Sequence, residues 1–179
     1  KQIQVIAANM DRAFVVATPV LPKISLGFIG RFLATAEAYS IPAGIIFNKS
    51  DIYDELIWEW MNELKQLYEQ INYKVFIVSS MNESTLDDLK RELKNKVNLF
   101  SGFSGVGKSS LINALIPGLN LKVSGISAQH QKGTHTTTFA EMHELPFGGF
   151  IIDTPGIREF GTIDFDKFEV SHFFPEIFK

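Results

Sequence analysis

The amino-acid sequence predicts one α/β domain with a mostly parallel sheet, and three observations point to it. Short apolar runs with strand character alternate with longer segments of helical periodicity, the pattern of parallel strands joined by helices. A glycine-rich segment links one apolar run to the helical segment that follows it. The 179 residues, 45% of them hydrophobic and 21% charged, are enough for one globular domain with a substantial core.

Strands and helices alternate regularly through the first half of the chain. Apolar runs predict buried strands over residues 13–17, 43–47 and 75–78, and helical spacing predicts helices over 28–39 and 57–71. Ser84, with Asp87 three residues later, is the predicted N-cap of a further helix. The helix over 57–71 has a predicted apolar face made of Ile57, Trp60, Met61, Leu64, Leu67, Tyr68 and Ile71.

The second half of the chain continues this alternation and then changes direction. A strand over 97–100 and a helix over 109–116 flank the glycine-rich segment. Alternating hydrophobicity over 138–145 predicts an antiparallel edge strand, Gly148 and Gly149 predict a turn, and residues 150–152 predict a last core strand. The expected sheet is therefore mostly parallel with one antiparallel edge strand.

Composition excludes several classes of protein. The chain has no cysteine, so it holds neither a disulfide framework nor a cysteine-ligated zinc site, and this fits the reducing cytoplasm. The formal net charge of −3 argues against a domain that grips nucleic acid mainly through its phosphates. No apolar run approaches the ~20 residues needed to span a bilayer. The chain has no initiator Met and ends on an apolar segment, so we expect a fragment of a longer protein.

The glycine-rich segment fits the phosphate-binding pattern G-x-x-x-x-G-K-[ST], and it predicts a P-loop NTPase fold of three layers. Glycines let successive backbone N–H groups point at phosphate oxygens, and the following helix adds its positive N-terminal end. A lysine supplies a point charge to the β- and γ-phosphates, and a serine hydroxyl binds Mg²⁺. The alternative is a glycine-rich turn with a surface lysine. The predicted phosphate-binding residues are Gly102, Phe103, Ser104, Gly105, Val106, Gly107, Lys108 and Ser109.

Asn48, Lys49, Ser50 and Asp51 form the N-K-x-D pattern of guanine recognition directly after the strand over 43–47. The Asp51 carboxylate can accept hydrogen bonds from the guanine N1–H and N2–H₂ groups, a donor pair that adenine lacks. Asn48 either bonds the base edge or ties loops together, and the Lys49 stem can lie along the base plane. The alternative is a polar loop in which Asp51 caps the next helix.

Two weaker signals follow other predicted strands. Ser79 and Ser80 come after the strand over 75–78, where a G protein places the loop whose backbone contacts the guanine O6. Asp153 and Gly156 frame a D-x-x-G pattern after the last strand, so Asp153 can reach Mg²⁺ and the Gly156 N–H can sense the γ-phosphate. A strand-to-helix turn and a Pro-Gly turn are the respective alternatives.

A threonine-rich segment over 133–138 lies between the phosphate loop and Asp153. A switch loop needs a threonine hydroxyl to complete the Mg²⁺ shell, and we assign this role to Thr137, with Thr136 or Thr138 as alternatives. The alternative for the whole segment is the beginning of a strand. His135 has either a catalytic, water-orienting role or a structural one.

The order of these motifs is informative. An ordinary G protein runs from phosphate loop to switch threonine, D-x-x-G, N-K-x-D and the serine loop, whereas this chain begins at N-K-x-D and ends at D-x-x-G. The cyclic order is intact, so the sequence predicts a circularly permuted GTPase domain. Chain ends that lie close together on a surface permit such a change without rebuilding the core.

The motifs resemble those of one family, the small-ribosomal-subunit-dependent GTPases of the RsgA type. The resemblance rests on four segments, 6–11, 104–113, 132–138 and 153–160, and it adds Ser110 to the phosphate-binding residues. Thr134 stands where the family often has Arg. The resemblance implies GTP hydrolysis stimulated by the small ribosomal subunit, GTP or GDP with Mg²⁺ as ligands, and a part in late maturation of that subunit. It points to His135 as a catalytic residue beside Lys108.

The resemblance also sets expectations for the whole protein. Residues 1–162 are expected to be the GTPase domain and residues 163–179 the start of a C-terminal extension. An OB-fold and a zinc-binding domain, which the family typically carries, are not expected within this sequence. Contact with ribosomal RNA belongs to the full-length protein, which is expected to be a cytoplasmic monomer that does not bind membranes.

Two other functions fit parts of the sequence. Ile157 follows the D-x-x-G glycine where Ras-like proteins place a water-orienting glutamine, and an apolar side chain cannot position water. The intrinsic rate of hydrolysis is therefore expected to be slow.

A non-hydrolysing GTP-dependent binding switch is the main alternative function. A P-loop ATPase is another, and the guanine-recognition residue Asp51 argues against it.

Overall fold

The computed structural model describes residues 9–23, 25–123 and 140–154. Its described strands form one sheet in the order β3-β2-β1-β4-β6-β5. All neighbouring strands are parallel except β5 and β6, which are antiparallel. This confirms the predicted mostly parallel sheet with one antiparallel edge strand. The strands are β1 (Arg12–Ala17), β2 (Ala43–Phe47), β3 (Lys74–Ile77), β4 (Val97–Ser101), β5 (Glu141–Glu144) and β6 (Phe150–Asp153).

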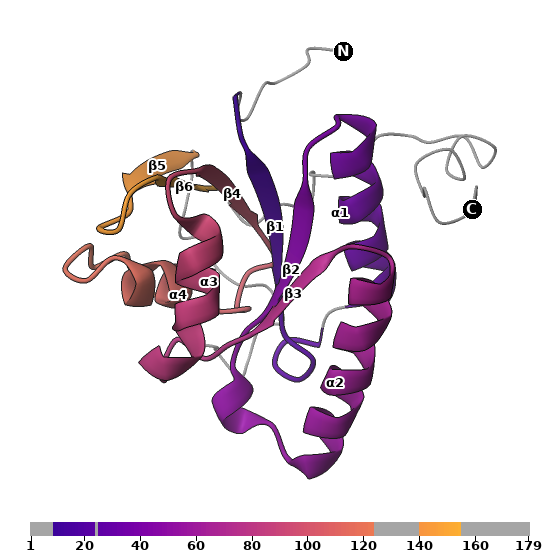
Figure 1. Ribbon diagram of the computed structural model, residues 1–179. Coiled ribbons are helices and arrows are strands. Elements are labelled where there is room, and N and C mark those ends of the chain that lie inside the picture. Colours follow the sequence, from indigo (N-terminus) through magenta and orange to yellow (C-terminus); the bar gives the residue numbers. More distant parts are fainter. Residues whose placement is uncertain (1–8, 24, 124–139, 155–179) are drawn as a thin grey trace.

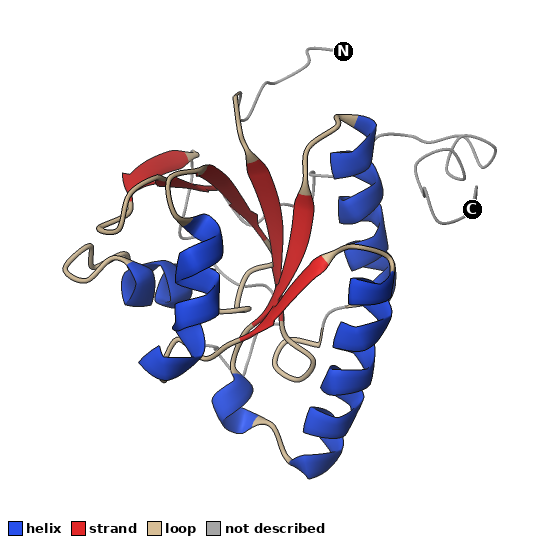
Figure 2. Ribbon diagram, in the orientation of Figure 1, coloured by secondary structure: helices blue, strands red, loops and turns tan. Residues whose placement is uncertain are grey.

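Helices cover both faces of the sheet and produce the predicted three layers (Figures 1 and 2). Helices α1 and α2 lie on one face, and α3 and α4 lie on the other (Figure 1). The chain moves outward from β1 to β3 and then returns to β4, so right-handed crossovers place the later helices on the opposite face. The helices are α1 (Leu26–Ala38), α2 (Glu55–Gln70), α3 (Asp87–Leu93) and α4 (Lys108–Leu115), with 3₁₀ turns η1 (Ser50–Ile52) and η2 (Glu83–Leu86).

Phenylalanine rings fill the centre of the core. Phe14 on β1 is buried and meets Phe76 and Phe100 edge to face, with ring centroids 6.1 and 6.0 Å apart. Aromatic pairs favour this geometry. Gly44 on β2 makes room for the Phe14 ring, because a Cβ at this position would lie 2.7 Å from Phe14 Cε1 and 3.0 Å from the carbonyl oxygen of Lys74.

Two helix starts differ from the sequence prediction. Helix α2 begins at Glu55, two residues early, because the Asp54 side chain accepts a hydrogen bond from the Ile57 N–H at 2.8 Å and caps it. The predicted N-cap Ser84 is wrong. Asn82 caps η2 instead, accepting from the Ser84 N–H at 3.2 Å, and α3 follows only at Asp87. Any Asn, Asp or Ser near a helix start can act as the N-cap, so residue spacing alone could not identify which neighbouring residue caps each helix.

The predicted apolar face of α2 is only partly buried. Met61 and Leu64 lie in the core. Trp60 and Leu67, which were assigned to the same face, are exposed. Ile57, Tyr68 and Ile71, toward the two ends of the helix, are half-buried and pack against the same core. The buried stripe therefore runs the length of the helix but is narrower than predicted, and Trp60 and Leu67 lie outside it. None of the described helices is long and apolar enough to cross a membrane.

The turn predicted at Gly148 and Gly149 closes the hairpin between β5 and β6. Both residues have φ near +93°, a backbone conformation that glycine adopts without steric cost. Their backbones pack directly against Asn95 and Lys96, where added Cβ atoms would lie 2.3 Å from Asn95 Oδ1 and 2.6 Å from the Lys96 carbonyl oxygen. Of the predicted strand over 138–145, residues 140–145 are described, and Glu141–Glu144 form β5.

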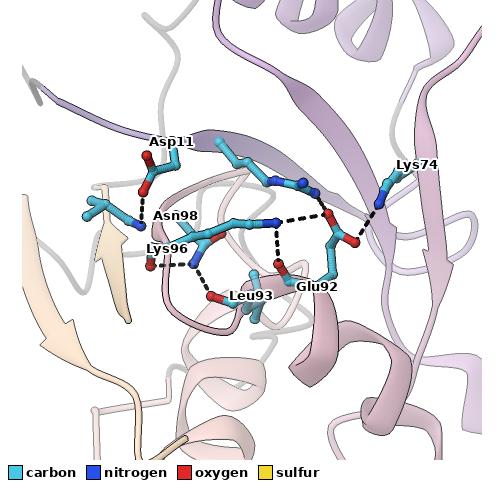
Figure 3. A network of polar contacts seen from close by, with 8 residues as sticks. Asp11, Lys74, Glu92, Leu93, Lys96 and Asn98 are labelled. Carbon is cyan, nitrogen blue, oxygen red and sulfur yellow. Dashed lines mark hydrogen bonds and ion pairs between the residues drawn. The ribbon is translucent and has the colours of Figure 1, made fainter. Parts of the chain in front are cut away.

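Ion pairs gather at the amino ends of the strands (Figure 3). Glu92 on α3 contacts Arg12, lies 2.6 Å from Lys74 Nζ and lies 3.7 Å from Lys96 Nζ. Partial burial lowers the pKa of Lys74, and the like charges of Arg12 and Lys96 lower it further. The buried Asn98 amide donates to the Lys96 carbonyl at 2.9 Å. This polar cluster joins α3 to three strands and fixes one end of the sheet.

Gly44→Ala should destabilise the domain by about 1–3 kcal/mol, because the buried Phe14 ring and the Lys74 backbone cannot move away cheaply. The matched control is Gly30→Ala on α1, where an added Cβ meets nothing within 4 Å and should raise helix propensity. Urea unfolding of both variants measures the difference. Equal stability of the two would contradict the close packing at Gly44.

Candidate functional site

The candidate site lies at the carboxyl edge of the sheet, where the strand order reverses. From β1 the chain leads to β2 on one side, whereas from β4 it leads toward β6 and β5 on the other. In open α/β sheets such a reversal leaves a crevice between the loops of the two strands, and ligands bind there. The loops after β1, β2, β3, β4 and β6 all reach this edge, because those strands run parallel.

The predicted phosphate loop joins β4 to α4 in the expected way. A Cβ on Gly102 would lie 2.5 Å from the Val16 carbonyl oxygen, so only glycine allows β4 to end this close to β1. Gly105 and Gly107 have φ values of +87° and +85°. Gly107 is the N-cap of α4, so the loop delivers its backbone to the helix N-terminus. The predicted residues are thus brought together as a curled loop.

Asn48 links the N-K-x-D loop to the phosphate loop. Its Nδ2 donates to the carbonyl oxygens of Val106 at 3.1 Å and Gly107 at 3.2 Å, and its Oδ1 accepts from the Ser80 N–H at 3.3 Å. The side chain is fully buried. Of the two predicted roles for Asn48, tying loops together is the one seen in these contacts.

Lys49 makes a second link between loops. Its ammonium donates to the carbonyl oxygen of Gly105 at 2.7 Å and to that of Leu21. Partial burial lowers the pKa of Lys49, and the nearby Asp51 carboxylate opposes this shift. The Leu21 loop, which follows β1, was missed by sequence reasoning. Its position after a strand beside the reversal point was the available signal.

The Asp51 carboxylate is held by Ser79. The Ser79 hydroxyl donates to Asp51 Oδ1 and accepts from the Met81 N–H at 3.0 Å. Asp51 itself is exposed at the site edge and lies in η1. It does not cap α2, because Asp54 does, so the alternative interpretation of Asp51 as a helix cap is wrong. The two predicted loops, after β2 and after β3, therefore meet at this carboxylate.

Tyr53 is a further member that sequence reasoning missed. Its buried hydroxyl donates to the Asn48 carbonyl oxygen at 2.8 Å, and its ring packs edge to face on Trp58. Burial raises the pKa of Tyr53, and the Asp51 charge raises it further, so the phenol stays protonated and keeps donating. The sequence does not indicate this role, because a tyrosine near an N-K-x-D motif belongs to no known pattern. Only the fold directs the Tyr53 hydroxyl back to the Asn48 carbonyl oxygen.

Lys108 and Asp153 meet at the other end of the phosphate loop. The buried Lys108 ammonium contacts the Asp153 carboxylate and donates to the Thr154 carbonyl oxygen at 2.5 Å. Thr154 is anchored in turn, since its hydroxyl donates to the Phe100 carbonyl oxygen at 2.9 Å. The motifs after β4 and β6 are thus in contact.

Beside Lys108, the side chains that could bind a metal ion are oxygen donors. Ser109 follows Lys108 at the start of α4, and Asp153 is buried beside the same lysine. Hydroxyl and carboxylate oxygens are ligands that Mg²⁺ accepts, usually together with substrate phosphates and water. No group of three or more His, Cys, Asp or Glu side chains that could hold a metal occurs among the described residues. The donors present therefore fit Mg²⁺ held partly by a nucleotide.

The remaining predicted site residues lie outside the described ranges. They are His135, Thr136, Thr137, Thr138 and Gly156.

This fold and this set of loops define a P-loop NTPase whose motifs follow a circularly permuted order. The family model of the RsgA GTPases matches residues 1–163. The chain therefore belongs to the RsgA GTPase family, as the sequence resemblance predicted.

Relatives and solved structures agree with this assignment. The chain is 53% identical, over its whole length, to a protein of Bacteroides fragilis named small ribosomal subunit biogenesis GTPase RsgA. A Flavobacterium psychrophilum protein of the same name is 48% identical over 99% of the chain. The chain spans 58% of the first relative and 55% of the second.

Two solved structures share the fold. The crystal structure of YjeQ from Thermotoga maritima matches with a TM-score of 0.77 and 34% identity, covering 94% of this chain and 55% of that one. The structure of YloQ, described as a circularly permuted GTPase, matches with a TM-score of 0.70 and 31% identity, covering 94% of this chain and 52% of that one. The predicted permuted fold is thereby confirmed.

Gly107→Ala should cost about 1–3 kcal/mol more stability than Gly118→Ala, because it adds a clash to the strain that both share. Both glycines have positive φ, but a Cβ at Gly107 would lie 2.5 Å from Asn48 Nδ2, whereas one at Gly118 meets nothing within 4 Å. Chemical denaturation of the two variants isolates the loop-to-loop contact. Indistinguishable losses would show that Asn48 does not press on the phosphate loop.

Proposed function

We propose that the chain binds GTP and hydrolyses it to GDP, as the GTPase domain of a factor for biogenesis of the small ribosomal subunit. The observation that carries the proposal is the Asn48 side chain, which holds the N-K-x-D loop against the phosphate loop. A guanine bound at the first loop would then have its phosphates at the second. The names of the relatives support both the reaction and the ribosomal role.

The base would lie between the loops after β2 and β3. Asp51 would accept hydrogen bonds from the guanine N1–H and N2–H₂ groups, and a carboxylate acceptor makes these bonds stronger than neutral ones. Ser79 holds that carboxylate in place. The Lys49 stem would cover one face of the base, because its ammonium is already held by the carbonyl oxygens of Gly105 and Leu21. The proposed base-binding residues are Asn48, Lys49, Ser50, Asp51, Ser79 and Ser80.

The phosphates would lie in the curl of the phosphate loop over residues 102–110. Backbone N–H groups at the α4 N-terminus would donate to phosphate oxygens. Lys108 would supply the point charge, exchanging its contact with Asp153 for the β- and γ-phosphates. Gly156 is proposed to contact the γ-phosphate.

Ser109, Asp153 and Thr137 are the proposed Mg²⁺ ligands, with Thr136 or Thr138 as alternatives to Thr137. Mg²⁺ held there would neutralise charge on the phosphate oxygens. The Asp153 carboxylate is buried beside Lys108, so it can serve the metal only where the lysine charge is also close. This arrangement concentrates positive charge where the transferred phosphoryl group would lie.

Hydrolysis would rest on positioning and electrostatics rather than covalent chemistry. Lys108 is the proposed electrostatic catalytic residue, and His135 is proposed to orient the attacking water. Ile157 cannot orient that water, so we propose a slow intrinsic rate of hydrolysis that the small ribosomal subunit stimulates.

Residues 1–162 are proposed as the GTPase domain and 163–179 as the start of an extension. Ribosomal RNA is the proposed partner of the full-length protein, a monomer in the cytoplasm.

Asp51→Asn should weaken GDP binding by about ten- to a hundredfold, the worth of a charged hydrogen-bond pair. It should also favour xanthosine diphosphate, whose C2 carbonyl can accept from the new amide. The matched control is Asp54→Asn, three residues away, because Asn caps α2 equally well. Titration calorimetry with GDP, ADP and xanthosine diphosphate measures these preferences. Tighter binding of ADP than of GDP by the unaltered chain would contradict guanine recognition.

His135→Ala should lower turnover stimulated by small ribosomal subunits by about a hundredfold or more, the usual contribution of a positioned acid–base group. The Kd for GDP should not change, since the base and phosphate loops are intact. Phosphate release by the full-length protein, with and without purified subunits, measures the effect. Unchanged stimulated turnover would remove His135 from the mechanism, and no turnover by the unaltered full-length protein in the presence of subunits would favour a non-hydrolysing switch.

A further inference from the structure

The loop after β3 folds back on itself, and the Thr85 side chain closes it. The Thr85 hydroxyl accepts from the Ser79 N–H at 2.9 Å and donates to the Asn82 carbonyl oxygen at 2.7 Å. The Asn82 N–H donates in turn to the Ser79 carbonyl oxygen at 3.1 Å. A ring of hydrogen bonds therefore closes residues 79–85. This segment belongs to the connection between β3 and α3 (Figure 1).

The first residue of this ring holds the base-recognition carboxylate. Ser79 is 1% exposed, and its hydroxyl donates to Asp51. A buried backbone N–H needs a partner, and water cannot readily replace one in such a place. Thr85 supplies that partner, so the backbone of Ser79 and the direction of its hydroxyl both depend on the Thr85 side chain.

The Thr85 hydroxyl is not required as a helix cap. Asn82 already caps η2 through its side chain, and the Thr85 N–H already donates to the Asn82 carbonyl at 3.1 Å. The hydroxyl instead faces back toward the end of β3. The hydroxyl therefore serves two groups at once, since it accepts from the Ser79 N–H and donates to the Asn82 carbonyl oxygen within the turn.

We propose that Thr85 is a positioning residue for guanine selection: its hydroxyl fixes Ser79, and Ser79 holds the Asp51 carboxylate toward the N1–H and N2–H₂ edge of the base. The inference rests on the proposed guanine binding and deepens it. Loss of the hydroxyl leaves the Asp51 side chain present but freer to turn, so it should weaken selection of the base more than binding of the phosphates.

The experiment compares GDP with inosine diphosphate, which lacks the N2 amino group, on the same protein preparation. The test variant is Thr85→Val, which keeps the shape and removes the hydroxyl, and Thr85→Ser restores the hydroxyl. Thr35→Val is the matched control, since Thr35 is also a threonine with a satisfied hydroxyl, donating to the Arg31 carbonyl at 2.8 Å on α1. The ratio of the two Kd values does not depend on the fraction of each preparation that is folded.

The unaltered chain should prefer GDP over inosine diphosphate by about tenfold or more, the worth of one hydrogen bond to a charged acceptor. Thr85→Val should reduce this preference by roughly three- to tenfold, whereas Thr85→Ser and Thr35→Val should keep it. Thr85→Ala provides the same test if the valine does not fit.

Two results overturn the inference while leaving guanine binding intact. One is a GDP preference in Thr85→Val and Thr85→Ala within twofold of the unaltered chain. The other is the same loss of preference in Thr85→Ser, which would assign the effect to the methyl group. A chain that binds ADP as tightly as GDP would instead overturn the proposed function itself.

Discussion

The buried Asn48 amide is the interaction on which the rest of the site depends. It donates to two carbonyls of the phosphate loop and accepts from the loop after β3, so three loops share one side chain. Loss of a hydrogen-bond partner by a buried amide lowers the stability of the fold. Because the Asn48 amide has partners in all three loops, it holds them in one rigid arrangement. Tyr53 then fixes the Asn48 backbone, and Gly107 leaves the space that the amide occupies.

Circular permutation leaves this interaction unchanged because it depends on strand order in space. Asn48 and Val106 are 58 positions apart along the chain, yet both follow strands near the point where the order reverses. A sheet fixes which loops are neighbours, whichever loop carries the chain ends. The same contact therefore forms whether the N-K-x-D loop precedes the phosphate loop or follows it.

The two ends of the sheet serve different purposes. At the amino ends, Glu92 collects Arg12, Lys74 and Lys96, and these ion pairs join α3 to the strands. At the carboxyl ends, the charged groups are Lys49, Asp51, Lys108 and Asp153, each fixed by backbone or side-chain partners. The polar groups of the candidate site are thus held in place by the fold, which is what preorganised binding requires.

The sequence by itself determined the fold class, the permuted order and most of the candidate residues. Hydrophobic periodicity is a local property, and the phosphate loop and N-K-x-D motif are contiguous, so both can be read along the chain. Only the tertiary structure decided that Asn48 ties loops together, that Asp54 and Asn82 are the helix caps, and that Trp60 and Leu67 face outward. It also brought in Leu21, Tyr53 and Thr85. Their roles come from hydrogen bonds whose partners the fold selects among many neighbours of similar chemistry, and no local pattern records that choice.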